Sequence, residues 1–159
     1  MMSNPIPLKV LLSLKEASDI IDEALRLARE HDMQPMTVMV MDAGGHQIAL
    51  KREDGSGIIR VQVACAKAYG ALGMGKSSRD LGDHVADRPL FSNSLSMISG
   101  GRFATVPGGV LICDDAGLVI GAVGVTGDSS SRDEFTAIGG IKAAGLRSSP
   151  DREAVNWDE

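Results

Sequence analysis

The sequence predicts an α+β fold in which helices pack on an antiparallel sheet. Apolar, β-branched segments occur in two pairs, and each pair is joined by a short turn rich in Asp and Gly, which is typical of β-hairpins. Segments with helical spacing of apolar residues stand before, between and after these hairpins, and no parallel β-α-β succession is present. The 159 residues, 43% of them hydrophobic, suffice for one buried core.

The first part of the chain predicts a helix followed by a hairpin. A capping box begins at Ser13, and apolar residues recur at helical intervals over residues 14–31. Residues 36–42 are rich in Val and Thr and predict a strand. The glycine-containing turn at 42–45 then leads into a second strand over 46–52.

The middle of the chain predicts two helices and an irregular segment. Residues 58–73 are rich in Ala and favour a helix, and Ser77 is placed to cap a shorter one. Residues 87–108 contain two prolines and an adjacent pair of glycines, which predicts irregular structure with one helical turn.

The last part predicts a second hairpin, a helix and a tail. The hairpin strands are residues 109–113 and 118–125. Ser131 begins a second capping-box pattern, so we expect a helix from there to about Ala144. The polar residues after Gly145 favour a loose tail.

Charge and composition exclude several classes of function. Sixteen Lys and Arg against 21 Asp and Glu give a net charge of −5, which opposes a nucleic-acid-binding surface. No apolar run approaches the roughly 20 residues of a membrane helix, and the N-terminus lacks the layout of a secretory signal. Cys65 and Cys113 form neither a CxxC motif nor a disulfide framework. We therefore expect a cytoplasmic protein without membrane or nucleic-acid partners.

A match to the phosphate-loop pattern occurs at residues 70–77. Such loops bind phosphate through backbone N–H groups that follow a buried strand. Here the preceding residues have helical spacing, and residues 114–115, which imitate a magnesium-binding strand end, lie in a hairpin turn. The favoured interpretation is a helix that ends in glycines.

Two cations on the second predicted helix are candidate ligand-binding residues. Arg60, Ala64, Lys67 and Ala71 fall along one face, where small alanines leave space and the cations could hold an anion. The alternative is that Arg60 and Lys67 are solvated or pair with carboxylates.

Glycines concentrate at the ends of the second predicted hairpin. Gly108 and Gly109 precede its first strand, and Gly127 follows its second, close to Asp133 in the next helix. Their N–H groups could receive a carboxylate, or the glycines could serve sheet curvature and tight turns.

The three histidines carry less information. His46 follows the Gly44–Gly45 turn and could act as a base or an iron ligand, although a histidine at a strand end is more often an ordinary surface residue. His84 lies among aspartates, which a solvated acidic helix explains, so we expect no metal site there. His31 near a helix C-terminus is explained by the helix dipole.

Taken together, an ordered set of motifs resembles one family. The motifs are residues 40–46, 54–55, 66–68, 78–81, 107–110, 121–127 and 133–134. This set is similar to the GlcG/HbpS-like family, often described as haem-degrading, which includes the C-terminal domain of PduO-type proteins. The resemblance covers residues 13–145 and implies one domain there, between a lead-in at 1–12 and a tail at 146–159.

The resemblance implies a profilin-like fold with about five antiparallel strands, assembled into dimers or octamers. Some family members bind haem or iron. The positions that match the family are Lys67, Gly108, Gly109, Gly127 and Asp133. A Ser-rich stretch at 127–131 replaces the commoner small-residue stretch, so a ligand site there could differ.

Three functional hypotheses follow. The first is a homo-oligomeric protein that binds haem or a small anionic metabolite in a pocket beside helix 58–73, through Arg60, Lys67 and the three glycines. The second is an isomerase, hydratase or decarboxylase acting on a small carboxylated intermediate, with Lys67, His46 or Asp133 as acid or base. The third is an assembly subunit whose small-residue helices pack between chains.

Overall fold

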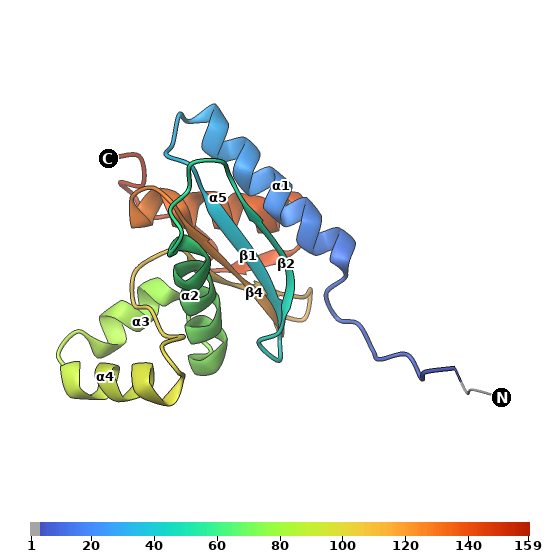
Figure 1. The fold of residues 1–159 in the computed structure, drawn as a ribbon, viewed down its shortest axis with the longest axis horizontal. Helices are drawn as coiled ribbons and strands as arrows, with labels where there is room; N and C mark the ends of the chain where they lie inside the picture. Colours follow the sequence, from blue (N-terminus) through green and yellow to red (C-terminus); the bar gives the residue numbers. More distant parts are fainter. Residues whose placement is uncertain (1–3) are drawn as a thin grey trace.

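The structure, a computed structural model that describes residues 4–159, contains a five-stranded sheet with helices on both faces (Figure 1). The strand order is β2-β1-β4-β3-β5, and every neighbouring pair is antiparallel. The strands are β1 (Thr37–Asp42), β2 (Gln47–Arg52), β3 (Gly109–Cys113), β4 (Val119–Thr126) and β5 (Arg147–Ser149). The predicted α+β class with a five-stranded antiparallel sheet is confirmed.

The helices form two layers around this sheet. They are α1 (Leu14–Glu30), α2 (Arg60–Met74), α3 (Ser78–Val85), α4 (Pro89–Ile98) and α5 (Ser130–Ala143). Helices α1 and α5 pack together on one face, and α2 covers the other face across β1, β4 and β3 (Figure 1). Helix α3 packs beside α2, while α4 lies farther from the sheet. None of the helices within residues 4–159 combines the length and the apolar content needed to span a membrane.

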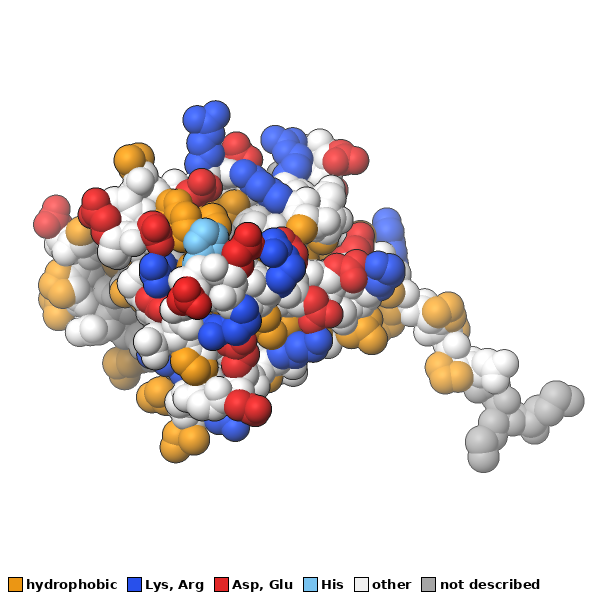
Figure 2. Space-filling view, turned by 90° about the horizontal axis from the view of Figure 1, so that it is seen from above, with side chains coloured by type: hydrophobic (Ala, Val, Ile, Leu, Met, Phe, Trp, Pro, Cys, Tyr) orange, Lys and Arg blue, Asp and Glu red, His pale blue; other side chains and the backbone are white. Residues whose placement is uncertain are grey.

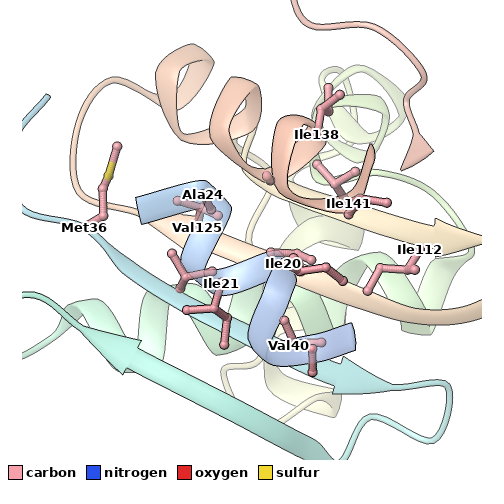
Figure 3. Close-up of a cluster of buried hydrophobic side chains, with 14 of the residues drawn as sticks. Ile20, Ile21, Ala24, Met36, Val40, Ile112, Val125, Ile138 and Ile141 are labelled. Carbon is pink, nitrogen blue, oxygen red and sulfur yellow. The ribbon is translucent and has the colours of Figure 1, made fainter. Parts of the chain in front are cut away.

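The larger core lies between the sheet and the α1–α5 layer (Figure 3). Ile20 and Ile21 of α1 and Ile138 and Ile141 of α5 are at most 2% exposed, and they meet the inward side chains of the strands, such as Val40. Burial of each such side chain contributes about 1.5–3 kcal/mol, so this layer supplies much of the stability.

The α2 side of the sheet is packed through small residues. Ala64, Ala68 and Ala71 of α2 are fully buried against the strands. A Cβ atom on Gly124 of β4 would lie 1.9 Å from the carbonyl oxygen of Ala64, so the helix backbone rests directly on the strand. The abundance of Gly and the scarcity of aromatic residues follow from this close approach.

Most predicted boundaries agree with the structure, and the capping box at Ser13 is present. The irregular segment was predicted wrongly, because α4 forms ten residues of helix there. Pro89 occupies the first turn of α4, where its missing N–H has no helical partner to lose. The cap of α5 was placed two residues too late: Ser129 accepts from the N–H of Arg132, and Ser131 lies inside the helix.

The two ends of the chain differ in how they relate to the sheet. The predicted lead-in falls partly outside the described residues, and its residues 4–12 form no helix or strand. The prediction of a loose tail was wrong for β5, which pairs with β3, and for Trp157, whose ring stacks on Phe135 at 3.6 Å. A strand of three residues gains its stability from the partner strand, so its own sequence gives no periodic signal.

Candidate functional site

Helices α2 and α5 lie on opposite faces of the sheet, yet one side chain from each meets the other in the interior. The Nζ atom of Lys67 in α2 lies 2.8 Å from Oδ2 of Asp133 in the first turn of α5, and both residues are 1% exposed. Lys67 also donates to the carbonyl oxygen of Val125, at 2.9 Å. Two of the predicted site residues are therefore brought together as a buried ion pair.

The glycine at the start of β3 makes room for this pair. Gly108 has a φ of +118°, and a Cβ atom there would lie 2.7 Å from the Nζ atom of Lys67. A Cβ atom on Gly109 would lie 2.3 Å from the carbonyl oxygen of Lys67, while its N–H donates to Oγ of Ser78 at 2.7 Å. The predicted glycines thus surround Lys67, and their backbone leaves a passage for its side chain.

A second acidic residue is buried beside this pair. Glu134 is 0% exposed, and its carboxylate lies 3.2 Å from a guanidinium nitrogen of Arg79 in α3. Burial raises the pKa of Glu134 to about 7, although the charge of Arg79 opposes this shift. Burial also lowers the pKa of Lys67 and raises that of Asp133, against the attraction between the two.

The other predicted binding residues lie around the edge of this cluster. Arg60 is partly buried and donates to Oγ1 of Thr126 at 2.7 Å. Its charge lowers the pKa values of both Lys67 and Asp133, so it faces the ion pair. A Cβ atom on Gly127 would lie 2.5 Å from the sulfur of Met36, so that glycine is packed tightly against the chain that enters β1.

His46 lies far from Lys67 and Asp133. It follows the β1–β2 turn, at the end of the sheet where Asp42 pairs with Gly121, whereas the ion pair lies at the end of β4 near Thr126. Five residues of extended strand separate these ends, which is about 17 Å. The three candidate acid–base residues therefore do not converge on one reacting centre.

A groove beside the C-terminal half of α2 was not predicted from the sequence. It encloses about 190 Å³, and its lining is mostly apolar: Tyr69, Gly70, Gly73, Met74, Leu95, Ile98, Ser99, Arg102 and Phe103. Within it, the guanidinium carbon of Arg102 stands 3.7 Å from the centroid of the Tyr69 ring, a cation–π contact. A single cation in an apolar groove is typical of a site that orients an anionic group of a ligand.

A smaller hollow of about 120 Å³ lies next to the groove, and Tyr69 and Gly73 line both. The turn at Ala43, Gly44 and Gly45 forms its other wall. A Cβ atom on Gly45 would lie 2.8 Å from Cε2 of Tyr69, so the turn backbone rests against the aromatic ring. The signals in the sequence were the sole tyrosine, the two glycines after it in α2, and the Gly-Gly turn before His46.

The side chain of His46 lies beside a carboxylate. Its Nδ1 lies 3.3 Å from Oδ1 of Asp42, which also accepts from the backbone N–H groups of Gly44 and His46. These interactions help to lower the pKa of Asp42 against the effect of its burial. The imidazole itself is 81% exposed.

Two further sequence patterns have a structural explanation. Gly70 and Gly73 of the phosphate-loop match lie inside α2, where their N–H groups belong to the helix and cannot wrap a phosphate. His84 is exposed on α3, and the described residues 4–159 contain no group of three or more His, Cys, Asp or Glu placed to hold a metal ion.

A family model described as "Haem degrading protein HbpS-like" matches residues 12–150, almost the whole chain. No curated protein matches the sequence. Among solved structures, a PduOC–haem complex is 26% identical, with a TM-score of 0.76, and the match covers 86% of this chain and 97% of that chain.

Two other solved structures share the fold. The Klebsiella pneumoniae protein ORFY is 21% identical with a TM-score of 0.77, and the match covers 91% of this chain and 98% of that one. A double mutant of Streptomyces reticuli HbpS is also 21% identical, with a TM-score of 0.71 and coverage of 89% and 97%.

Proposed function

The chain belongs to the HbpS-like family of haem degrading proteins, and on this basis we propose that it binds haem in the groove beside Tyr69. The complex of the relative PduOC with haem supports this ligand class. The observation that carries the proposal is the placement of Arg102 over Tyr69 in an apolar groove that shares Tyr69 and Gly73 with the smaller hollow.

The chemistry of the groove fits the macrocycle of haem. Haem is flat and apolar and carries two propionate groups at one edge. Leu95, Ile98 and Phe103 offer apolar contacts, and Arg102 is a bidentate donor that suits a propionate. The groove and the adjoining hollow together have a volume at the low end of that of ligand pockets, so part of the macrocycle stays at the surface.

A candidate ligand for the iron lies next to the site. His46 directly follows the turn that walls the smaller hollow, and its exposed imidazole has Nδ1 3.3 Å from Oδ1 of Asp42. A neutral imidazole is the commonest axial ligand of haem iron, and a carboxylate on its other nitrogen strengthens it as a ligand. In this proposal His46 binds the iron, Arg102 binds a propionate, and Tyr69 supports the face of the macrocycle.

Bound haem would supply redox and oxygen chemistry, which its axial ligand tunes. The residues of this chain would set the orientation of the macrocycle and the access of water to it. The buried Lys67–Asp133 pair takes no direct part, because both side chains are inaccessible to a ligand. The ion pair contributes indirectly, because it fixes the position of α2, and therefore of Tyr69, relative to the sheet.

Titration with haemin, followed by the Soret absorbance, tests the proposal. The wild-type protein is expected to shift the Soret band at micromolar concentration. His46→Ala should change the band position because the iron loses its ligand, and Arg102→Ala should weaken binding about tenfold through the loss of a charge-assisted contact. His84→Ala, which removes an exposed histidine elsewhere, is the matched control and should behave as the wild type.

Three outcomes would contradict the proposal. The first is a wild-type protein that leaves the haemin spectrum unchanged. The second is equal binding by the wild type and both site variants, which would place haem elsewhere. The third is a protein that binds a small carboxylate through Arg102 but does not bind haemin. This result would identify the groove as a site for an anionic metabolite.

A further inference from the structure

Five glycines lie inside helices within residues 4–159, and one of them has no packing role. A Cβ atom on each of the other four would lie 2.3–3.2 Å from a neighbouring atom; these four are Gly70, Gly82, Gly139 and Gly140. An added Cβ atom on Gly73 of α2 would have nothing within 4 Å. Gly73 is also exposed, and its φ does not lie in the left-handed region. Neither packing nor backbone conformation therefore requires a glycine at residue 73.

A glycine in a helix has an energetic cost. It loses more backbone freedom on folding than alanine does, so Gly73 makes α2 less stable than Ala would. Natural sequences depart from local rules of this kind mainly at functional sites, where a gain in function offsets the loss of stability. The surface around Gly73 shows what that gain is.

Gly73 lies where two hollows meet. The groove of about 190 Å³ and the smaller hollow of about 120 Å³ share two lining residues, Tyr69 and Gly73. These two residues are four positions apart, so they stand in one row along α2. Gly70 and Met74 line the groove on one side of this row, and Leu72 lines the hollow on the other. A side chain at residue 73 would therefore extend the ridge that Tyr69 forms between the two hollows.

The size and the chemistry of the two hollows indicate what would lie across them. Ligand pockets enclose about 300–1,000 Å³, a range that neither hollow reaches alone and that the two together just reach. The face in Figure 2 carries interspersed charged side chains of both signs. The lining of the groove is instead mostly apolar, with the guanidinium of Arg102 over the Tyr69 ring. This lining suits a ligand with a large apolar body and an anionic group.

We infer that Gly73 determines which ligands the site accepts, because the bare backbone of α2 at Gly73 lets one flat, largely apolar anion lie across both hollows. The anionic group of this ligand binds Arg102, and its body passes beside Tyr69. The inference rests on the proposed function, since haem is a ligand of this class. A larger side chain at residue 73 would divide the site and leave the groove to smaller anions.

Substitutions at residue 73 test the inference by ligand binding. Gly73→Leu should weaken the binding of haemin, followed by Soret absorbance, by about tenfold or more, and Gly73→Ala should weaken it by a smaller factor. The same order is expected for pyrene-1-sulfonate, a flat aromatic anion without a metal, followed by its fluorescence. Asn93→Leu, at an exposed position of α4 outside both linings, is the matched control and should bind both probes as the wild type does.

The stability of the same variants provides a second readout. The urea midpoints of Gly73→Ala and Gly73→Leu should be no lower than that of the wild type, because Ala and Leu favour helix and the added Cβ atom meets no neighbour. Gly140→Ala, whose Cβ atom would lie 2.5 Å from the carbonyl oxygen of Ile20, represents a packing glycine and should lower the midpoint. Weaker binding without a loss of stability is a result that a purely structural glycine would not give.

The outcomes separate this inference from the proposed function. If Gly73→Leu binds both probes as tightly as the wild type while Arg102→Ala binds them more weakly, the ligand does not cross α2 and the inference is overturned, although the proposed function stands. If the wild type binds pyrene-1-sulfonate but not haemin, and Gly73→Leu loses that binding, the inference stands and haem is not the ligand. A wild type that binds neither probe overturns both, and a Gly73→Leu variant less stable than the wild type overturns the inference.

Discussion

The Nζ atom of Lys67 and the carboxylate of Asp133, 2.8 Å apart, join helices on opposite faces of the sheet. Gly108 makes this contact sterically possible, and the N–H of Asp128 donates to the second oxygen of Asp133 at 3.0 Å. The carboxylate thus binds α2 and the loop before α5 at the same time. A pair buried in this way depends on both partners, since a single charge left in the interior is costly.

We expect Lys67→Met to lower the free energy of unfolding by about 3–5 kcal/mol, because it leaves the buried carboxyl group of Asp133 without its partner. Urea denaturation measures this. Arg26→Met, which breaks exposed ion pairs with Glu23 and Glu30 on α1, is the control and should cost less than about 1 kcal/mol. Equal effects of the two substitutions would show that the buried pair has no special role.

The contact between α2 and the sheet should tolerate no side chain at Gly124. Gly124→Ala would place a Cβ atom 1.9 Å from the carbonyl oxygen of Ala64, so we expect a loss of about 3 kcal/mol or more. Gly73→Ala, in α2 with nothing within 4 Å of the added atom, should instead raise stability by up to about 1 kcal/mol through helix propensity. Thermal unfolding of both variants checks the opposite signs, and a stable Gly124→Ala would refute the packing.

The start of α5 can be located by mutation. Ser129→Ala removes the side chain that accepts from the N–H of Arg132 and should cost about 1 kcal/mol. Ser131→Ala, inside the helix, should change stability by a few tenths of a kcal/mol at most. Urea denaturation measures both losses. A larger loss for Ser131→Ala than for Ser129→Ala would show that Ser131 is the cap, as the sequence predicted.

The buried carboxyl of Glu134 should make stability fall as the pH rises. Its pKa is about 7 in the folded protein and 4.5 ordinarily, so between these values only the unfolded chain has released the proton. This contribution is fully present below pH 4.5, and up to about 3 kcal/mol is lost as the pH rises through 7.

Glu134→Gln removes this titration. The stability of the variant relative to the wild type should therefore increase between pH 5 and pH 8, as urea denaturation at several pH values would show. Glu30→Gln, an exposed substitution of the same chemistry on α1, controls for the lost charge. A constant difference between Glu134→Gln and the wild type across this range would contradict the prediction.

The sequence identified several residues around Lys67 but did not predict how they are arranged in space. Lys67, Gly108, Gly109 and Asp133 were singled out, and the structure brings them together, although as an interior ion pair and not as the wall of a pocket. The groove at Tyr69 and Arg102 was missed, because their contact depends on the path of α4 and the loop after it.

The sequence by itself determined the features that depend on near neighbours. The capping box at Ser13, the two hairpin turns and the small-residue face of α2 follow from residues a few positions apart, so local spacing predicts them. Only the tertiary structure decided that Lys67 meets Asp133, 66 positions away, and that β5 adds to β3. Such contacts depend on strand order and register. These are decided by the packing energy of the whole sheet, so they leave no periodic pattern in the sequence of any one segment.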